Sequence, residues 1–281
     1  EGATGEATVT GSSSDWSIND LYVGAAGNGT LTISNKGSVS AAIGTYVGAN
    51  KGSNGTLQLE SGGTLFSSDS HIGYDTGSTG AATITGPGSQ WINSGNFFVG
   101  NFGNGTLRIE NGGSLSAFRG IVGNDSDISG SVMVTGPNSQ WISTYGTIVG
   151  NVGSGTLRIE NGGSLSTGEG DIGNLVDSAG TVAVTGAGSQ WLSTGNLYVG
   201  VEGNGTLTVS NGGSVGAANT SVGLEAGSKG TINIGAASGS LVAAAGTLTA
   251  DNLTFGSGAG TLVFNHTSND YLFSPAMSGA G

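Results

Sequence analysis

The sequence predicts an all-β chain that folds as a right-handed, single-stranded parallel β-helix of roughly ten coils. The first observation is a repeat of about 25 residues, which is the length of one coil of a solenoid. The second is that each repeat divides into short strand patterns separated by glycine-rich turns. One glycine precedes the first strand of every repeat, and its successive spacings are 24, 26 and then 25 seven times. These glycines are Gly5, Gly29, Gly55, Gly80, Gly105, Gly130, Gly155, Gly180, Gly205 and Gly230.

Each coil is expected to contain three short strands. Leu107 and Ile109 alternate with polar residues, which is the period of a strand with one buried face. Asn111-Gly112-Gly113 then reads as a turn, because such residues tolerate left-handed backbone conformations. A second strand surrounds Leu115, and a third ends at Val122 before the next glycine. No segment shows a helical pattern, so the prediction is all-β.

Two kinds of coil alternate from Gly55 to Gly230, which gives a super-repeat of 50 residues. One kind carries Asn-Gly-Gly-Ser-Leu, and the other carries Ser-Gln-Trp after a turn that is one residue longer. The extra residue moves the indole into the inward position that leucine occupies on neighbouring coils. Core packing is therefore the favoured interpretation, and a surface aromatic binding site is the alternative. The tryptophans are Trp16, Trp91, Trp141 and Trp191.

The whole chain, residues 1–281, is expected to form one solenoid rather than several domains. Residues 1–230 hold the regular alternating coils. Residues 231–281 hold irregular coils, and Gly246 and Gly260 each look like the start of a shorter one. The sequence opens within a coil and ends without a recognisable cap, so we expect a fragment of a longer protein.

Composition limits the classes of partner. Six Lys and Arg against 18 Asp and Glu give a formal net charge of −12, whereas nucleic-acid binding needs clustered positive charge. We therefore expect no nucleic-acid partner. No apolar run is long enough for a membrane-spanning helix, so we expect no direct membrane insertion by this chain. The absence of cysteine excludes disulfides and thiolate metal sites.

Two rows of charged residues are the candidate binding faces. The turn after the third strand is two residues longer in alternate coils, and these long turns contain acidic residues. Stacked at every second coil, they would form an acidic edge with a spacing of roughly 10 Å. Its members are Asp75, Asp125, Asp127, Asp177 and Glu225. The second row lies on the outward face of the first strand and consists of Glu60, Arg108, Glu110, Arg158 and Glu160.

Catalytic and metal chemistry find little support in the sequence. His71 and His266 are the two histidines that could act as a general base, and neither lies near a nucleophile motif. We assign no catalytic residue and expect no enzymatic activity. Asn124, Asp125 and Asp127 gather several oxygen atoms in one turn, so calcium is a candidate ligand there, although a solvated loop is the favoured interpretation. No other cofactor is expected.

The repeat motifs resemble those of a known family. Gly-Asn-Gly-Thr-Leu-x-Ile-x-Asn-Gly-Gly-Ser at residues 103–114, with Val-Thr-Gly-Pro-x-Ser-Gln-Trp at 134–141, resembles a repeat in the passenger domains of bacterial type V autotransporters. Residues 258–281, including Tyr-Leu-Phe-Ser-Pro, look like the autotransporter-associated β-strand repeat. The resemblance implies a right-handed β-helix on the bacterial surface or secreted. It also implies a signal peptide before the first residue and an outer-membrane barrel after the last, and it supplies no shared binding residues.

Many passengers of this family are adhesins. The function expected from the resemblance is a surface-displayed adhesin that mediates bacterial aggregation, biofilm formation or host attachment. Its mechanism would be lateral polar contact between rods, in which each weak contact makes the next one effectively intramolecular. The expected partner is another copy of the chain, or a host surface protein or glycan. The alternatives are a passive stalk that presents another domain and a glycan-active β-helix enzyme.

Overall fold

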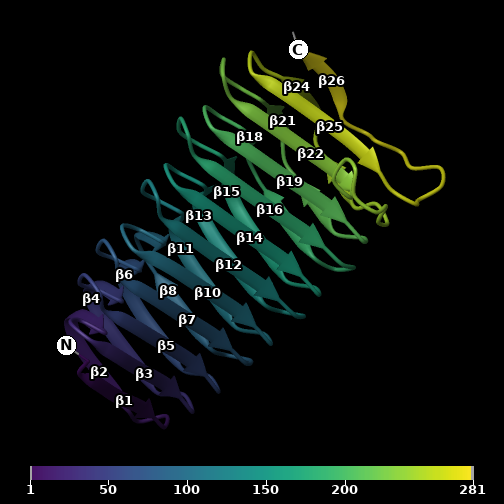
Figure 1. The fold of residues 1–281 in the computed structure, drawn as a ribbon. Helices are drawn as coiled ribbons and strands as arrows, with labels where there is room; N and C mark the ends of the chain where they lie inside the picture. The colour runs from purple at the N-terminus through teal and green to yellow at the C-terminus, as the bar shows by residue number, and fades with distance from the viewer. Residues whose placement is uncertain (1, 280–281) are drawn as a thin grey trace.

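The computed structural model describes residues 2–279, which form eleven coils and no helix. The coils stack along one axis, with the first and last coils at opposite ends of the molecule (Figure 1). Ten steps of about 4.8 Å, the spacing of neighbouring strands, give a rod on the order of 50 Å long. The predicted all-β solenoid of parallel strands is confirmed. Within the described residues, nothing forms a helix long and apolar enough to cross a membrane.

The first strand of every coil belongs to one sheet of eleven parallel strands. Its register places the marker glycines in one column, so that Gly105 pairs with Gly80 on one side and with Gly130 on the other. In spatial order the strands are β1 (Thr4–Thr10), β3 (Asn28–Ser34), β5 (Asn54–Glu60), β7 (Thr79–Thr85), β10 (Asn104–Glu110), β12 (Ser129–Thr135), β14 (Ser154–Glu160), β16 (Ala179–Thr185), β19 (Asn204–Ser210), β22 (Lys229–Gly235) and β25 (Ala259–Asn265).

The second and third predicted strands of a coil share a second sheet, and in six coils they run on as one strand. The prediction of three separate strands per coil was wrong there, because the bend is an irregularity within a strand, such as that between Ala117 and Arg119, and needs no glycine-rich turn. The six strands are β2 (Asp15–Val23), β4 (Ser38–Val47), β6 (Thr64–Ile72), β11 (Ser114–Val122), β13 (Gln140–Val149) and β15 (Ser164–Ile172). The remaining strands of this sheet are β8 (Gln90–Asn93), β9 (Asn96–Val99), β17 (Gln190–Ser193), β18 (Leu197–Val199), β20 (Ser214–Gly216), β21 (Asn219–Val222), β23 (Thr247–Thr249), β24 (Asn252–Phe255) and β26 (Ala276–Gly279).

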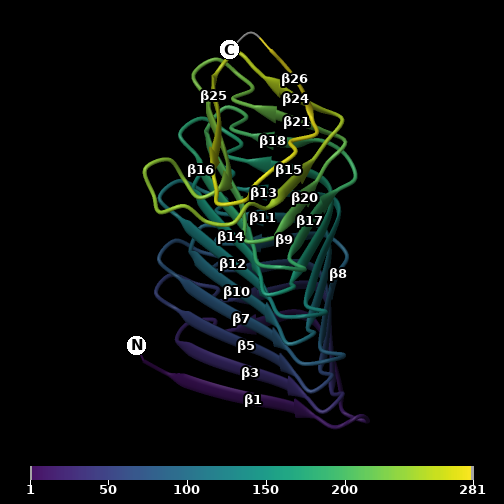
Figure 2. The ribbon, with the colours of Figure 1, turned by 90° about the vertical axis from the view of Figure 1, so that its right-hand side faces the viewer.

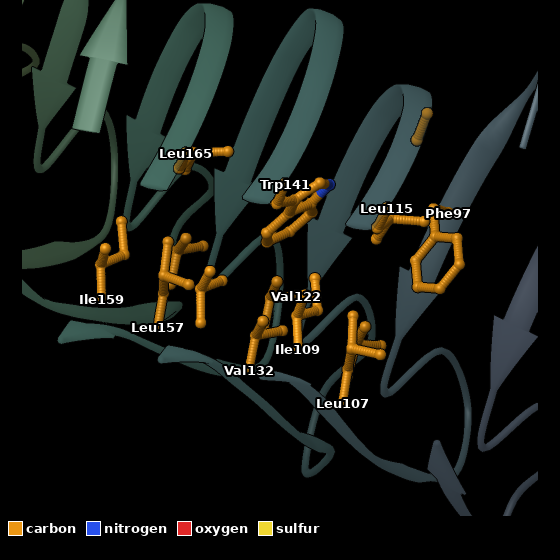
Figure 3. Close-up of a cluster of buried hydrophobic side chains, with 14 of the residues drawn as sticks. Phe97, Leu107, Ile109, Leu115, Val122, Val132, Trp141, Leu157, Ile159 and Leu165 are labelled. Carbon is orange, nitrogen blue, oxygen red and sulfur yellow. The ribbon is translucent and has the colours of Figure 1, made fainter. Parts of the chain in front are cut away.

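One continuous core runs between the two sheets, and large indoles alternate with leucines along it. The register aligns Trp141 with Leu115 on one side and with Leu165 on the other. Figure 3 shows the Trp141 indole between these two leucines. Trp91, Trp141 and Trp191 are each 0% exposed. The longer turn of the tryptophan coils thus delivers an indole to the position that leucine fills on the adjacent coils.

Trp16 is the exception among the four tryptophans. Its partner in the register is Val39 of β4, but β2 is the end strand of its sheet, so no described strand covers the other side of the indole. The side chain is consequently 37% exposed. The expectation that Trp16 would be buried in the core does not hold in this chain.

The last coils are longer than the regular ones. Gly230 pairs with Gly260, 30 residues later, instead of after 25 residues. Gly246, which we predicted to start a shorter coil, instead precedes β23, and β23 pairs with β20 of the second sheet. That prediction was wrong because Gly-Thr-Leu-Thr is compatible with either sheet. Figure 2 shows the longer connections in this yellow-green part of the rod.

Polar groups enter the core at the bend of the second sheet, and their hydrogen bonding differs between super-repeats. Trp91 Nε1 donates to Ser67 Oγ at 2.9 Å, and Ser67 Oγ donates in turn to Asn93 Oδ1. Ser67 lies two residues after Leu65, the register partner of Trp91. In the next super-repeat the equivalent position, two residues after the leucine that pairs with Trp141, is Ala117. Trp141 Nε1 is buried and has no hydrogen-bond partner within the described residues. Trp191 Nε1 is likewise buried without a partner within the described residues, since the hydroxyl of Thr167, at the position of Ser67, donates to the carbonyl oxygen of Glu169. Of the three buried indoles, one is therefore hydrogen-bonded and two are not.

Replacing Ala117 by Ser should stabilise the fold by about 1 kcal/mol, because the hydroxyl can accept from Trp141 Nε1 and a buried hydrogen bond contributes about that much. Urea unfolding followed by tryptophan fluorescence measures the effect. The matched control is S67A, which removes the acceptor of Trp91 and should lower the midpoint. An A117S midpoint at or below that of the wild type would contradict this account of the bend.

Candidate functional site

The outward face of the first sheet carries the predicted Arg and Glu row, and most of its charges pair within their own strands. Arg108 Nε donates to Glu110 Oε2, and Arg158 Nη2 donates to Glu160 Oε2 at 2.8 Å. Both arginine side chains are about half exposed, so each ion pair contributes only about 0–1 kcal/mol to stability. Glu60 lies in the same row, where β5 has a glutamine in place of the arginine. The row is therefore locally neutral on β10 and β14 and acidic on β5.

The acidic residues of the long turns form two short rows instead of the single acidic edge that we predicted. A backbone hydrogen bond closes each turn and defines equivalent positions. The carbonyl acceptors of these bonds belong to Asp75, Asp125, Leu175 and Glu225. The position two residues later has a positive φ and holds Gly77, Asp127, Asp177 and Gly227. Because that backbone conformation favours glycine, asparagine and aspartate, the turn geometry is sufficient to explain Asp127 and Asp177.

Asn124, one of the three oxygen-rich residues considered for calcium, belongs to a ladder of side-chain amides. Its Nδ2 donates to Asn101 Oδ1 at 2.7 Å, and its Oδ1 accepts from Asn151 Nδ2 at 2.9 Å. Asp125 Oδ1 accepts from the backbone N–H of the next residue, and Asp127 is exposed. Within residues 2–279, no three His, Cys, Asp or Glu side chains are grouped so as to hold a metal ion. Oxygen atoms of Asn124 and Asp125 thus already accept hydrogen bonds, one from the turn of the next coil and one from within their own turn.

The amide ladder ends at His71, whose ring is also part of an aromatic stack. Asn101 Nδ2 donates to His71 Nδ1 at 3.1 Å, an arrangement that requires an unprotonated Nδ1. The imidazole stacks between Tyr46 and Phe98, with ring centroids 5.2 and 4.8 Å away. Burial lowers the pKa of His71 to about 4, despite the opposing effect of Asp69. The ring is therefore neutral at physiological pH and one of its nitrogens is engaged in the ladder.

Asp171 is the second titratable group with a strongly shifted pKa. It lies in the outward row of the second sheet that includes His71, between Ile148 and Tyr198. Burial, and then the carboxylate of Glu169, raise the pKa of Asp171 to about 6, while Arg119 lowers it in part. The charge of this face therefore changes between about pH 5 and pH 7.

The residue after each of the three buried tryptophans forms an outward row that the sequence analysis missed. Because side chains alternate along a strand, an inward tryptophan is followed by an outward residue. Ile92, Ile142 and Leu192 occupy these positions and are 36%, 40% and 43% exposed. The register places Ser116 and Ser166 on the coils between them. We call Ile92, Ile142 and Leu192 the apolar ridge. Its signal was the Trp-Ile or Trp-Leu pair, which in isolation reads as core.

Comparisons with known proteins provide no family assignment. No protein-family profile and no curated protein matches the chain. Among solved structures, the chain is similar to one described as "Crystal structure of TibC-catalyzed hyper-glycosylated TibA55-350 fragment". The TM-score is 0.36 and the sequence identity 17%, and the match covers 98% of this chain and 94% of that chain. At this level the likeness supports no conclusion about function.

Replacing Asp171 by Asn should stabilise the protein above pH 6 and have little effect below pH 4. The folded pKa of about 6 exceeds the usual 3.8, so the contribution of the protonated carboxyl is complete below pH 3.8 and is lost as the pH rises through 6. The amide avoids this loss, and the expected gain in free energy of unfolding at pH 7.5 is roughly 2–3 kcal/mol.

Urea unfolding of the wild type and D171N at pH 3.5 and pH 7.5 measures this difference. The control is E169Q, which removes the same charge from an exposed neighbour and should stabilise far less at pH 7.5. The titration of His71 is common to all three proteins and cancels in the comparison. A D171N effect of equal size at both pH values would contradict the prediction.

Proposed function

We propose that this chain is the rod of a surface-displayed bacterial adhesin, which acts through lateral contacts along its outward rows. The observation that carries the proposal is that eleven coils present their outward side chains in register along the whole rod. Contacts that are weak individually add up on such a surface, because the first one raises the effective concentration of the others. The motifs that resemble autotransporter passenger repeats support location on the bacterial surface or secretion.

The partner we propose is another copy of the chain, or alternatively a host surface protein or glycan. The Arg and Glu row offers both signs of charge, so two rods could exchange ion pairs across it: Arg108 and Arg158 with Glu110 and Glu160. The acidic residues of the long turns offer one sign only. They would repel a second copy at low salt and would suit a cationic partner.

Beads coated with the purified chain should cluster with one another, or adhere to surfaces coated with host matrix protein or glycan. We expect at least about tenfold more clustering or adhesion than for beads coated with albumin, an acidic protein without a repetitive face, because multivalent contacts multiply. Microscopy of the suspension and of washed surfaces provides the count. Beads that neither cluster nor adhere would indicate a passive spacer and contradict the proposal.

A further inference from the structure

We infer that the apolar ridge is the contact surface for a second copy of this chain, with the two rods antiparallel. The inference rests on the proposed adhesive function and specifies both the partner and the face. It depends on three features of the second sheet: the alternation of large and small outward residues, the charges beside them, and the area available.

Large and small outward residues alternate over six consecutive coils. In order along the rod they are Ile92, Ser116, Ile142, Ser166, Leu192 and Gly216. The protrusions therefore recur at every second coil, roughly 10 Å apart, with recesses of one coil between them. Such a surface packs closely against a copy of itself only when the protrusions of one copy meet the recesses of the other.

A two-fold axis provides this match when it lies in the interface, parallel to the strands, between β13 and β15. This axis reverses the order of the coils and preserves the direction of the strands. It places Ile142 opposite Ser166 of the second copy, and Leu192 opposite Ser116 of the second copy. Ile92, at one end of the six positions, then lies opposite Gly216 of the second copy at the other end. A two-fold axis along the rod would instead place every large residue opposite itself.

The charges beside the ridge fit the same arrangement. At the bend of the second sheet, Gly146 is the register partner of Arg119 on one side and of Glu169 on the other. The Arg119 guanidinium carbon lies 4.4 Å from the centre of the Tyr145 ring. In the antiparallel pair, Glu169 of the second copy faces Gly146, one coil away from Arg119. The interface therefore contains this pair of opposite charges twice, which favours contact here between chains of net charge −12.

The surface has the area and the apolar content that a specific interface needs. Phe66 lies in the same row as the ridge, and the stacked rings of Phe118 and Tyr145 lie beside it at the bend. These three side chains are 42%, 47% and 49% exposed. The contact would extend over eight coils, from the coil of Phe66 to its counterpart on the other side of the two-fold axis. At about 4.8 Å per coil, and with a sheet face about 20 Å wide, its area is on the order of 800 Å², which is what each partner buries in a standard interface.

Sedimentation velocity over low to high micromolar concentrations tests the contact. The wild type should show a monomer–dimer equilibrium. The variant I92S/I142S/L192S should raise the dissociation constant at least about tenfold, because it removes the central apolar contacts. The matched control is V176S/L241S/V242S, which removes three residues that are more exposed but lie off the ridge, and it should leave the dissociation constant unchanged. Urea midpoints confirm that each variant folds.

Cross-linking tests the antiparallel orientation. The chain has no cysteine, so single cysteines can be introduced cleanly. A short bismaleimide should link S166C to itself, because this position lies beside the two-fold axis. It should not link S40C, which lies in the same row but roughly 40 Å from its counterpart in an antiparallel pair. Equal linking of both variants would indicate parallel rods and overturn the inference.

The outcomes separate this inference from the proposed function. A wild type that stays monomeric, or a ridge variant that dimerises as well as the wild type, would overturn the inference. The proposed function would survive either result if the wild-type beads still cluster or adhere. Beads that do neither would refute the proposed function, whatever the state of the chain in solution.

Discussion

The close approach of backbone to backbone at the third turn is the constraint on which the rest of this structure depends. Gly100 has a φ of 74°, and a Cβ on Gly105 would lie 2.2 Å from Gly100 N and 2.4 Å from the carbonyl oxygen of Ile72. Any side chain at Gly105 would separate the ends of the turn and displace the next strand. A displacement of one residue would exchange the inward and outward faces of that strand. The glycine column therefore fixes the register of every coil against the next.

With the register fixed, every surface property becomes a row along the rod. The same rule produces the amide ladder through Asn101 and Asn124, the aromatic stack around His71, and the apolar ridge. The core and the ridge are linked, because the longer turn that brings Trp141 inward also makes Ile142 face outward. The super-repeat of 50 residues is thus expressed twice, as alternating indole and leucine inside and as alternating large and small residues outside.

How much could be read from the sequence depends on whether a feature is local. The repeat length and the strand pattern were predictable, because Gly-Thr-Leu and Asn-Gly-Gly act within a few residues. The bend that joins the second and third strands has no such signal, so those strands appeared separate. The alignment of the acidic turns also needed the structure, since Leu175 and not the nearby aspartate is the equivalent of Asp125. Asn124 and Asn151 are bonded although 27 residues apart, a spacing outside the main period. The ridge required the register too, because an apolar residue beside tryptophan normally indicates core.

Distances between spin labels on the first sheet would test the in-register stacking most directly. Thr56, Thr156 and Thr206 are outward residues of one register column, and the chain has no native cysteine to interfere with labelling. Pulsed electron–electron double resonance measures the distance between two spin labels attached to introduced cysteines. Labels at Thr56 and Thr156, four coils apart, should be separated by roughly 19 Å, and labels at Thr56 and Thr206, six coils apart, by roughly 29 Å. An increase of about 10 Å for 50 further residues is what one coil per repeat predicts. Distances that do not increase with the number of coils would contradict it.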